Sequence, residues 1–478
     1  MALSAAGILA VVQFNELSEQ TDGANPERVP SGRAANLLVL GGGPTPALNQ
    51  VSIEQDVALA IETVGPAAAV LYSGGPNTLG VRVLDEARLK TPSLRVALGN
   101  IFAPREGRAS RYRPTTLRVT GAASPKNLTK ALAAMPASAD PFVLYLAGHG
   151  DRGDNAAGNR LSLWGRNDLL SAELAVMLDD VDRPVRVVGS MCFSGGFAEL
   201  VFKAGDPGQG ATERDRCGLF AAPWDLVASG CDPDPNRRSQ EGFAVHFFNA
   251  LRGTDRHGKK LPRTSIDFDG DGQVSLLEAH TRVQIVSESA DVPTTTSGRW
   301  LEYVAPAGGR TEPVDLPEER VVVETLTRRL DMTVREADAQ LRTALDRLAL
   351  DEQAIIDGEQ DIEVAYQALS AAMLARWPVI DDPWHPDYDA MLHTHTRAIT
   401  DFLELSAEAR AYFDALEQLE TKDAFLYQQQ RRSAQLERLV RAAYTLEAAG
   451  QLKARGGAEW ETFRRLRQCE RWVPDLAQ

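Results

Sequence analysis

Four short apolar runs mark the first part of the chain, at residues 37–40, 67–72, 142–146 and 185–188. Glycine follows each run within two positions. Uninterrupted apolar runs of this length are typical of strands that are buried on both faces of a sheet. Helical stretches separate them, including one that Ser124 and Pro125 open as an N-cap and first-turn pair. We therefore predict an α/β domain over residues 36–312, with a mostly parallel sheet and helices on both faces.

The pattern changes after Pro317 to long stretches rich in Glu, Arg, Ala, Leu and Gln. Apolar residues recur there at three- and four-residue spacing, as in Leu341, Leu345 and Leu348. This spacing predicts an all-α region over residues 313–478, broken at residues 377–386 by three prolines. The apolar stripes of these helices need another surface. Packing within one bundle, self-association and docking of a protein partner are the three alternatives.

The first 35 residues carry a weaker pattern. Met1 to Phe14 is a short apolar run without the Lys or Arg of a secretory n-region, and it is too short to span a bilayer. Residues 15–35 are polar and interrupted by Gly and Pro, which is typical of a tether. A residual export signal and a plain N-terminal helix or strand are both open, so the sequence is compatible with an extracytoplasmic or a cytoplasmic location. No stretch of the sequence predicts a transmembrane helix.

Composition excludes several classes of protein. With 44% hydrophobic and 24% charged residues, the chain is an ordinary globular protein, and a formal net charge of −15 argues against nucleic-acid binding. The four cysteines lack the paired C-x-x-C spacing of a zinc site. Cys217 and Cys231 are either bonded, if the protein is exported, or two free thiols. No Gly-rich phosphate-binding motif is complete, so we predict no organic cofactor.

The strongest chemical signal is a histidine and a cysteine, each placed just after an apolar strand. His149 follows residues 142–146, Cys192 follows residues 185–188, and small residues flank both. If the two strands are neighbours, the imidazole of His149 can take the proton of the Cys192 thiol, which is the activation a thiol nucleophile needs. A turn histidine and a buried structural cysteine are the alternative.

These motifs resemble those of a clan of cysteine peptidases that includes caspases, metacaspases, legumains and gingipains. The resemblance rests on His149-Gly150 and on the turn Ser190-Met191-Cys192-Phe193-Ser194-Gly195-Gly196, and it extends over about residues 36–305. It implies a caspase-like fold, cleavage of a protein or peptide substrate, and an oxyanion hole made by the amides of Gly150 and Cys192. Residues 49–57 resemble a legumain segment in which Asn49 would orient His149; a helix N-cap or turn is the alternative for Asn49.

The same resemblance bears on specificity. Ser190 stands two residues before Cys192, where caspases have a Gln and legumains and metacaspases have an acid that lines the pocket for the P1 side chain. Residues 226–232 resemble the strand that forms the S1 wall in these relatives, which would place Asp232 at the wall and favour a basic P1 residue. A surface turn is the alternative for Asp232.

Residues 267–278 fit a twelve-residue calcium loop at every diagnostic position. A helix is expected after the loop but not before it, so we predict half an EF-hand that binds a structural Ca²⁺. An acidic Asp-Gly turn without an ion is the alternative. The expected oxygen ligands are Asp267, Asp269, Asp271, the Gln273 carbonyl, Ser275 and Glu278.

Taken together, these patterns predict a calcium-binding, caspase-like thiol protease that acts as an endopeptidase through Cys192 and His149. The alternative is a catalytically silent caspase-like scaffold that binds a protein partner through its C-terminal helices.

Overall fold

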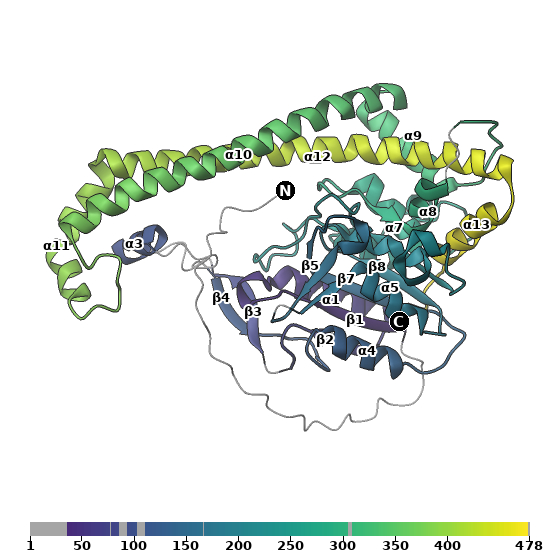
Figure 1. The fold of residues 1–478 in the computed structure, drawn as a ribbon, viewed down its shortest axis with the longest axis horizontal. Coiled ribbons are helices and arrows are strands. Elements are labelled where there is room, and N and C mark those ends of the chain that lie inside the picture. The colour runs from purple at the N-terminus through teal and green to yellow at the C-terminus, as the bar shows by residue number, and fades with distance from the viewer. Residues whose placement is uncertain are drawn as a thin grey trace.

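The computed structural model describes residues 36–76, 78–85, 93–102, 110–165, 167–304 and 308–476. The expectations for residues 1–35 lie outside these ranges. The core is a sheet in the order β10-β9-β8-β5-β1-β2, parallel except for the β9–β10 pair (Figure 1). Its strands are β1 (Leu37–Gly42), β2 (Ala67–Tyr72), β5 (Phe142–Asp151), β8 (Val185–Gly189), β9 (Arg216–Phe220) and β10 (Thr294–Thr295). The predicted α/β fold with a mostly parallel sheet is therefore confirmed.

Alternate residues of each central strand face opposite layers of helices. Leu37 and Val39 of β1 pack in the core with α1 (Val51–Val64), α6 (Phe243–Leu251) and α7 (Leu276–Val286). Leu38 and Leu40 pack in the other core with α4 (Pro125–Ala133) and α5 (Ser171–Asp179). Ser124 caps α4 as expected, since its Oγ accepts a hydrogen bond from Asn127 N at 3.3 Å.

Two antiparallel strand pairs complete the α/β part. The hairpin of β6 (Arg160–Leu163) and β7 (Asn167–Leu170) pairs through β6 with the last three residues of β5, from His149 to Asp151, and β3 (Leu79–Leu84) pairs with β4 (Ser110–Pro114) in a separate sheet. Arg82 of β3 donates from its backbone N to Asn49 O at 2.8 Å and from Nη1 to Ala47 O at 3.1 Å. The β3–β4 pair therefore supports the segment between β1 and α1.

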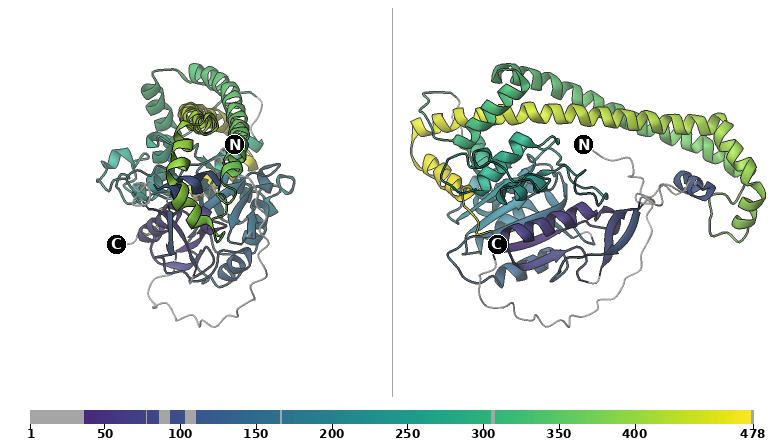
Figure 2. Two further views of the ribbon diagram at one scale, coloured as in Figure 1. Left: turned by 90° about the vertical axis from the view of Figure 1, so that its left-hand side faces the viewer. Right: turned by 180° about the vertical axis from the view of Figure 1, so that it is seen from behind.

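The C-terminal region is all α-helical, as predicted. It comprises α8 (Thr296–Val304), α9 (Pro317–Leu330), α10 (Val334–Arg376), α11 (Tyr388–Leu405), α12 (Ala407–Arg455) and α13 (Ala458–Glu470). α10 and α12, roughly 65 and 75 Å long at 1.5 Å per residue, lie side by side along the α/β part and project beyond it to α11 (Figures 1 and 2). The helical path breaks after Arg376, as the proline-rich residues 377–386 predicted.

A short helix from the α/β part lies at the far end of this helical arm. α3 (Leu94–Phe102), which lies between β3 and β4 in the sequence, packs Leu98 and Ile101 into one apolar cluster with residues of α10 and α11 (Figure 2). Arg95 also pairs with Asp389. Residues almost 300 positions apart in the chain therefore share one small core.

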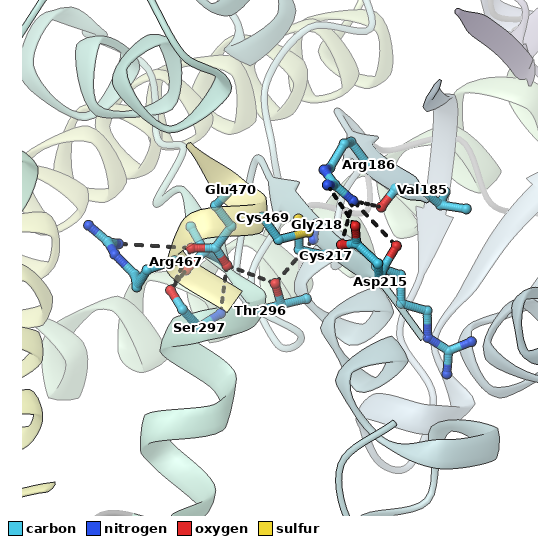
Figure 3. Close-up of a disulfide and its surroundings, with 12 residues drawn as sticks. Val185, Arg186, Asp215, Cys217, Gly218, Thr296, Ser297, Arg467, Cys469 and Glu470 are labelled. Atoms are coloured by element: carbon cyan, nitrogen blue, oxygen red, sulfur yellow. Dashed lines mark hydrogen bonds and ion pairs between the residues drawn. A yellow bond between two sulfur atoms is a disulfide. The ribbon is translucent and has the colours of Figure 1, made fainter. Parts of the chain in front are cut away.

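The base of the arm is joined to the sheet by a disulfide between Cys217 of β9 and Cys469 of α13, 252 residues apart (Figure 3). The alternative in which Cys217 bonds Cys231 is wrong, and Cys231 is a free thiol. Beside the disulfide, the fully buried Glu470 carboxylate accepts hydrogen bonds from Thr296 Oγ1, Ser297 N and Ser297 Oγ at 2.6–2.7 Å. A carboxylate is favourable there because it meets the first turn of α8.

Within the described ranges, no helix is both long enough and apolar enough to cross a membrane.

Candidate active site

His149 and Cys192 lie at the same edge of the sheet, at the carboxyl ends of two neighbouring strands. β5 and β8 are parallel and pair Leu146 with Gly189; His149 lies three residues after the first and Cys192 three residues after the second. The two segments touch, because a Cβ atom added to Gly150 would lie 2.0 Å from the Cys192 carbonyl oxygen. The strands that precede His149 and Cys192 are therefore neighbours, as the pairing of these two residues requires.

The imidazole of His149 is held on one side by the β1–α1 connection. Its Nε2 lies 2.8 Å from Leu48 O and 2.9 Å from Gln50 Oε1. The Leu48 carbonyl oxygen can only accept a hydrogen bond, so Nε2 carries the hydrogen and donates it. The neutral ring then has Nδ1 as its basic nitrogen.

Asn49 lies between these two partners in the sequence and is fully buried. Its Oδ1 accepts hydrogen bonds from Gly43 N at 3.0 Å and Tyr72 OH at 2.9 Å, and its Nδ2 donates to Gly80 O at 3.4 Å. These contacts stabilise the β1–α1 connection. The side chain that reaches His149 Nε2 is that of Gln50, the residue after Asn49. No sequence motif had indicated Gln50.

The Cys192 thiol is partly exposed and contacts the segment after β9. Ala228 N donates to its Sγ at 3.3 Å, and Sγ lies 3.4 Å from Ala228 O. Burial, and next the nearby Cys231 thiol, raise the pKa of Cys192 to about 12. The thiol is therefore neutral at neutral pH, and it would need a base in order to act as a nucleophile.

The turn that carries Cys192 is held from several sides. Phe193 has a positive φ of 55°, which is uncommon for a residue other than Gly, Asn or Asp. Asn159 Nδ2 donates to Phe193 O at 2.9 Å and to Trp224 O. Gly195 packs so closely that a Cβ would lie 2.7 Å from Ala222 O. These contacts fix the direction in which Cys192 leaves the strand.

A small cavity opens beside Cys192. It is lined by Ile53, Asp56, residues 147–148, residues 190–192, residues 228–231 and Ala244. Ser190, a predicted substrate contact, is in this wall, with its Oγ 2.9 Å from Tyr145 OH. The cavity measures about 10 Å³, roughly the space of one water molecule.

Among the described residues that line the cavity, the acid is Asp56 of α1. Its carboxylate pairs with Arg237, and burial raises its pKa while Arg237 opposes that rise. Asp232 follows the lining residue Cys231, and its Oδ1 accepts a hydrogen bond from Asp234 N at 2.8 Å. The carboxylate of Asp232 thus caps a turn, and a turn was the alternative to a place in the S1 wall.

The predicted calcium loop lies apart from this cavity, before α7. One oxygen each from Asp267, Asp269 and Asp271 lies within 4.8 Å of the others, an arrangement that could hold an ion. Glu278 is buried at the start of α7, where its carboxylate accepts hydrogen bonds from Phe268 N at 2.6 Å and Ser275 N at 2.8 Å. The helix after the loop is present and the segment before it has only a short 3₁₀ turn, Arg263–Ser265. Gln273 donates its backbone N to Asp271 Oδ1.

Comparison with protein-family models finds no match to this chain, and comparison with curated proteins finds no significant match either.

Proposed function

We propose that the protein is a cysteine endopeptidase with Cys192 as nucleophile and His149 as base. One observation carries the proposal: His149 and Cys192 each lie three residues after a paired position of two neighbouring parallel strands, β5 and β8. The Nε2 atom of His149 is at the same time held by Leu48 O and Gln50 Oε1. With the hydrogen on Nε2, Nδ1 is the basic nitrogen of the neutral ring, and we assign to it the role of accepting the thiol proton. The motif resemblance to caspases, metacaspases, legumains and gingipains is consistent with this arrangement.

The proposed reaction begins when Nδ1 of His149 accepts the proton of the Cys192 thiol as Sγ attacks the carbonyl carbon of the scissile bond. The amides of Gly150 and Cys192 donate to the resulting oxyanion, each contributing roughly 3 kcal/mol of transition-state stabilisation. The protonated imidazole then gives its proton to the leaving amine. Water, deprotonated by the same imidazole, releases the acid product and restores the thiol.

The test is covalent labelling of the full-length protein with a peptide acyloxymethyl ketone library, together with hydrolysis of the matching peptides. Labelling and turnover should disappear in Cys192→Ala and His149→Ala. Cys231→Ala is the matched control, because it removes the other free thiol of the same cavity, and it should still be labelled. Retained turnover in Cys192→Ala would exclude this nucleophile. No labelling of a folded native protein would favour the silent scaffold.

Gln50 gives a second, graded test. Replacing it with Ala removes one of the two acceptors on Nε2, and that acceptor strengthens when the ring becomes charged. Loss of a hydrogen bond to a charged group costs roughly 1.5–3 kcal/mol, so kcat should fall by a factor of about ten or more. Leu48 O remains as a partner, so activity should fall without disappearing.

We further propose that the loop of Asp267, Asp269 and Asp271 binds a structural Ca²⁺, with Gln273, Ser275 and Glu278 as the remaining ligands. Three carboxylates this close repel one another, and a divalent cation would neutralise them. The loop leads directly into α7, which packs in the core with α1 and α6. Bound calcium would therefore stabilise the proposed peptidase domain without entering its chemistry.

A further inference from the structure

Arg438 lies in the middle of α12, in the helical region, and its side chain is almost fully buried at 1% exposed. The guanidinium donates to four backbone carbonyls, one in the last turn of α7 and three in the segment that follows α7. Nε donates to Asp291 O at 2.6 Å, Nη1 to Ser287 O at 2.8 Å and Gln284 O at 3.4 Å, and Nη2 to Ser289 O at 2.8 Å.

This arrangement suits arginine and no other side chain. The planar guanidinium offers five N–H donors in a fixed fork, whereas lysine offers a single ammonium on a flexible stem. Gln284 and Ser287 lie at the end of α7, where a cation meets the negative end of the helix dipole. Because a buried charge is costly unless its hydrogen bonds are made, the four carbonyls and Arg438 fix one another.

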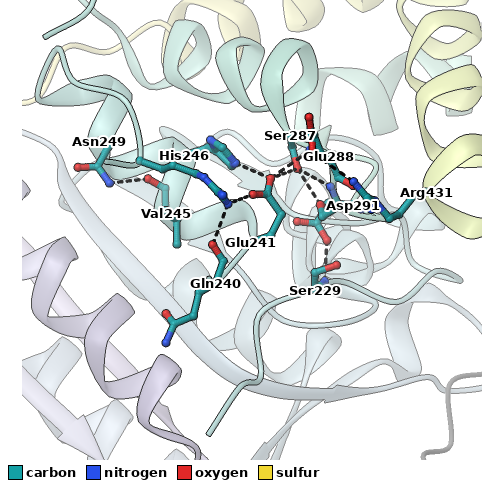
Figure 4. A network of polar contacts seen from close by, with 12 residues as sticks. Ser229, Gln240, Glu241, Val245, His246, Asn249, Ser287, Glu288, Asp291 and Arg431 are labelled. Carbon is teal, nitrogen blue, oxygen red and sulfur yellow. Dashed lines mark hydrogen bonds and ion pairs between the residues drawn. The ribbon is translucent and has the colours of Figure 1, made fainter. Parts of the chain in front are cut away.

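The segment that Arg438 holds reaches the wall of the active-site cavity. The Asp291 side chain is fully buried, and its Oδ1 accepts a hydrogen bond from Ser229 N at 2.6 Å (Figure 4). Ser229 belongs to residues 228–231 of the cavity wall, and its neighbour Ala228 contacts Cys192 Sγ. Three consecutive links therefore join α12 to the proposed nucleophile.

We propose that Arg438 is a positioning residue for substrate recognition: acting through Asp291, it holds residues 228–231 as the wall that receives the P1 side chain. The helical region then completes the substrate site without supplying a group that touches the reacting atoms. The predicted effect on substrates rests on the proposed function. The chain of contacts that leads from Arg438 through Asp291 and residues 228–229 to Cys192 does not depend on that function.

The chain contains a matched control on the same helix. Arg431 precedes Arg438 by two helical turns and binds the same segment from its exposed side, through Glu288 O and the Glu288 carboxylate (Figure 4). Among the described residues its hydrogen bonds go to Glu288 and not to Asp291, so Arg431→Lys perturbs the α12 contact while leaving the Asp291–Ser229 link in place.

Two measurements on the full chain test the proposal. The first is the rate at which iodoacetamide alkylates Cys192, read by mass spectrometry of the peptide that contains it. The second is the separation of kcat from KM with the best peptide substrate. Arg438→Lys and Asp291→Ala should each change the Cys192 alkylation rate several-fold and raise KM roughly tenfold with little change in kcat. Arg431→Lys should change neither, and Asp291→Asn, which keeps an acceptor for Ser229 N, should fall between native and Asp291→Ala.

An alkylation rate at Cys192 that is the same in native protein, Arg438→Lys and Asp291→Ala overturns the proposal. If Arg438→Lys does not fold, Asp291→Ala decides, because it keeps the arginine and its four carbonyls. A native protein that cleaves no peptide contradicts the proposed function, but the alkylation rates still decide whether Arg438 positions the wall.

Discussion

Asp232 is hydrogen-bonded to Ser52 of α1, the helix that also carries Asp56, and of these two acids Asp56 is the one that lines the cavity. Ser52 accepts Asp232 N on its Oγ at 2.7 Å and donates its own N to Asp232 O at 3.2 Å. Asp56 lies one helical turn after Ser52 and faces the cavity. Any preference for a basic P1 residue should therefore depend on Asp56.

The corresponding prediction compares two isosteric variants. Asp56→Asn should lower kcat/KM for Arg and Lys at P1 about tenfold relative to neutral P1 residues, because it removes the charge beside the pocket. Asp232→Asn should leave that ratio unchanged. A positional P1 library measured on the three proteins gives the ratio. A native profile dominated by Asp or by large apolar residues would contradict a basic preference altogether.

At this scale the sequence predicted where the histidine and the cysteine lie but not which side chains surround them. His149 and Cys192 follow apolar strands, so the pattern alone places them at one sheet edge. Gln50 and Asp56 have no such signal, because which side chain of the β1–α1 connection reaches the histidine depends on turns fixed by contacts with β3. Asn49 instead bonds Gly43 N, Tyr72 OH and Gly80 O, and the Asp232 carboxylate accepts a hydrogen bond from Asp234 N.

At the scale of single elements, α7 links the proposed calcium loop to the sheet. Removing calcium with a chelator should lower the melting temperature, since a ligand at a hundredfold excess over its Kd contributes about 2.7 kcal/mol of stability. Asp269→Asn should weaken this response, and Asp315→Asn, at an exposed carboxylate outside the loop, should retain it. Identical melting curves with and without chelator would mean that the loop takes no ion.

α7 also carries a histidine that should make stability depend on pH. Burial lowers the pKa of His280 to about 3, and its Nε2 donates to Thr294 O of β10 at 3.1 Å. The unfolded chain takes up this proton below its ordinary pKa of about 6.5, whereas the folded protein does not, so the stability is present above that pH and is lost as the pH falls toward 3. From pH 6.5 to 5 the loss from this group should be about 2 kcal/mol.

Urea unfolding of native protein and His280→Gln at these two pH values measures the contribution of His280. The variant should show a smaller difference between pH 6.5 and 5, because glutamine does not titrate. An unchanged pH dependence in His280→Gln would assign the effect to other groups.

The elements themselves were predictable where the local pattern is strong. β1, β2 and the first part of β5 are continuous apolar runs, β8 is apolar except for Arg186, and the long helices carry three- and four-residue spacing. The β3–β4 and β6–β7 strand pairs were not predicted, because their strands are short and partly exposed. The sequence of β4, Ser-Arg-Tyr-Arg-Pro, is not an apolar run. Their pairing comes from tertiary contacts that a local pattern does not contain.

At the scale of the whole molecule, interactions cross the boundary that the composition change suggested at residue 312. Arg438, Cys469 and Glu470 all bond to residues before it. Spacing could not have paired Cys217 with Cys469, since 252 residues separate them.

This separation gives a prediction about stability. In the chain-entropy model, a cross-link over a loop this long stabilises the fold by up to about 5 kcal/mol. Cys469→Ser should therefore lower the melting temperature clearly, while Cys231→Ser, which removes a free thiol, should not. Equal melting of Cys469→Ser and native protein would show that the disulfide contributes no net stability.

The docking of α3 on the far end of the helical arm also sets an order of events during synthesis. Leu98 leaves the ribosome long before Leu369 and Tyr388, its partners in the same cluster. At about 5–20 residues per second, the nascent α3 waits on the order of tens of seconds for them. During that interval the apolar face of α3 is without its native cover, and a chaperone or a neighbouring nascent chain can bind it. Because α3 needs the helical arm, the α/β part can complete its folding only after the arm has been synthesised.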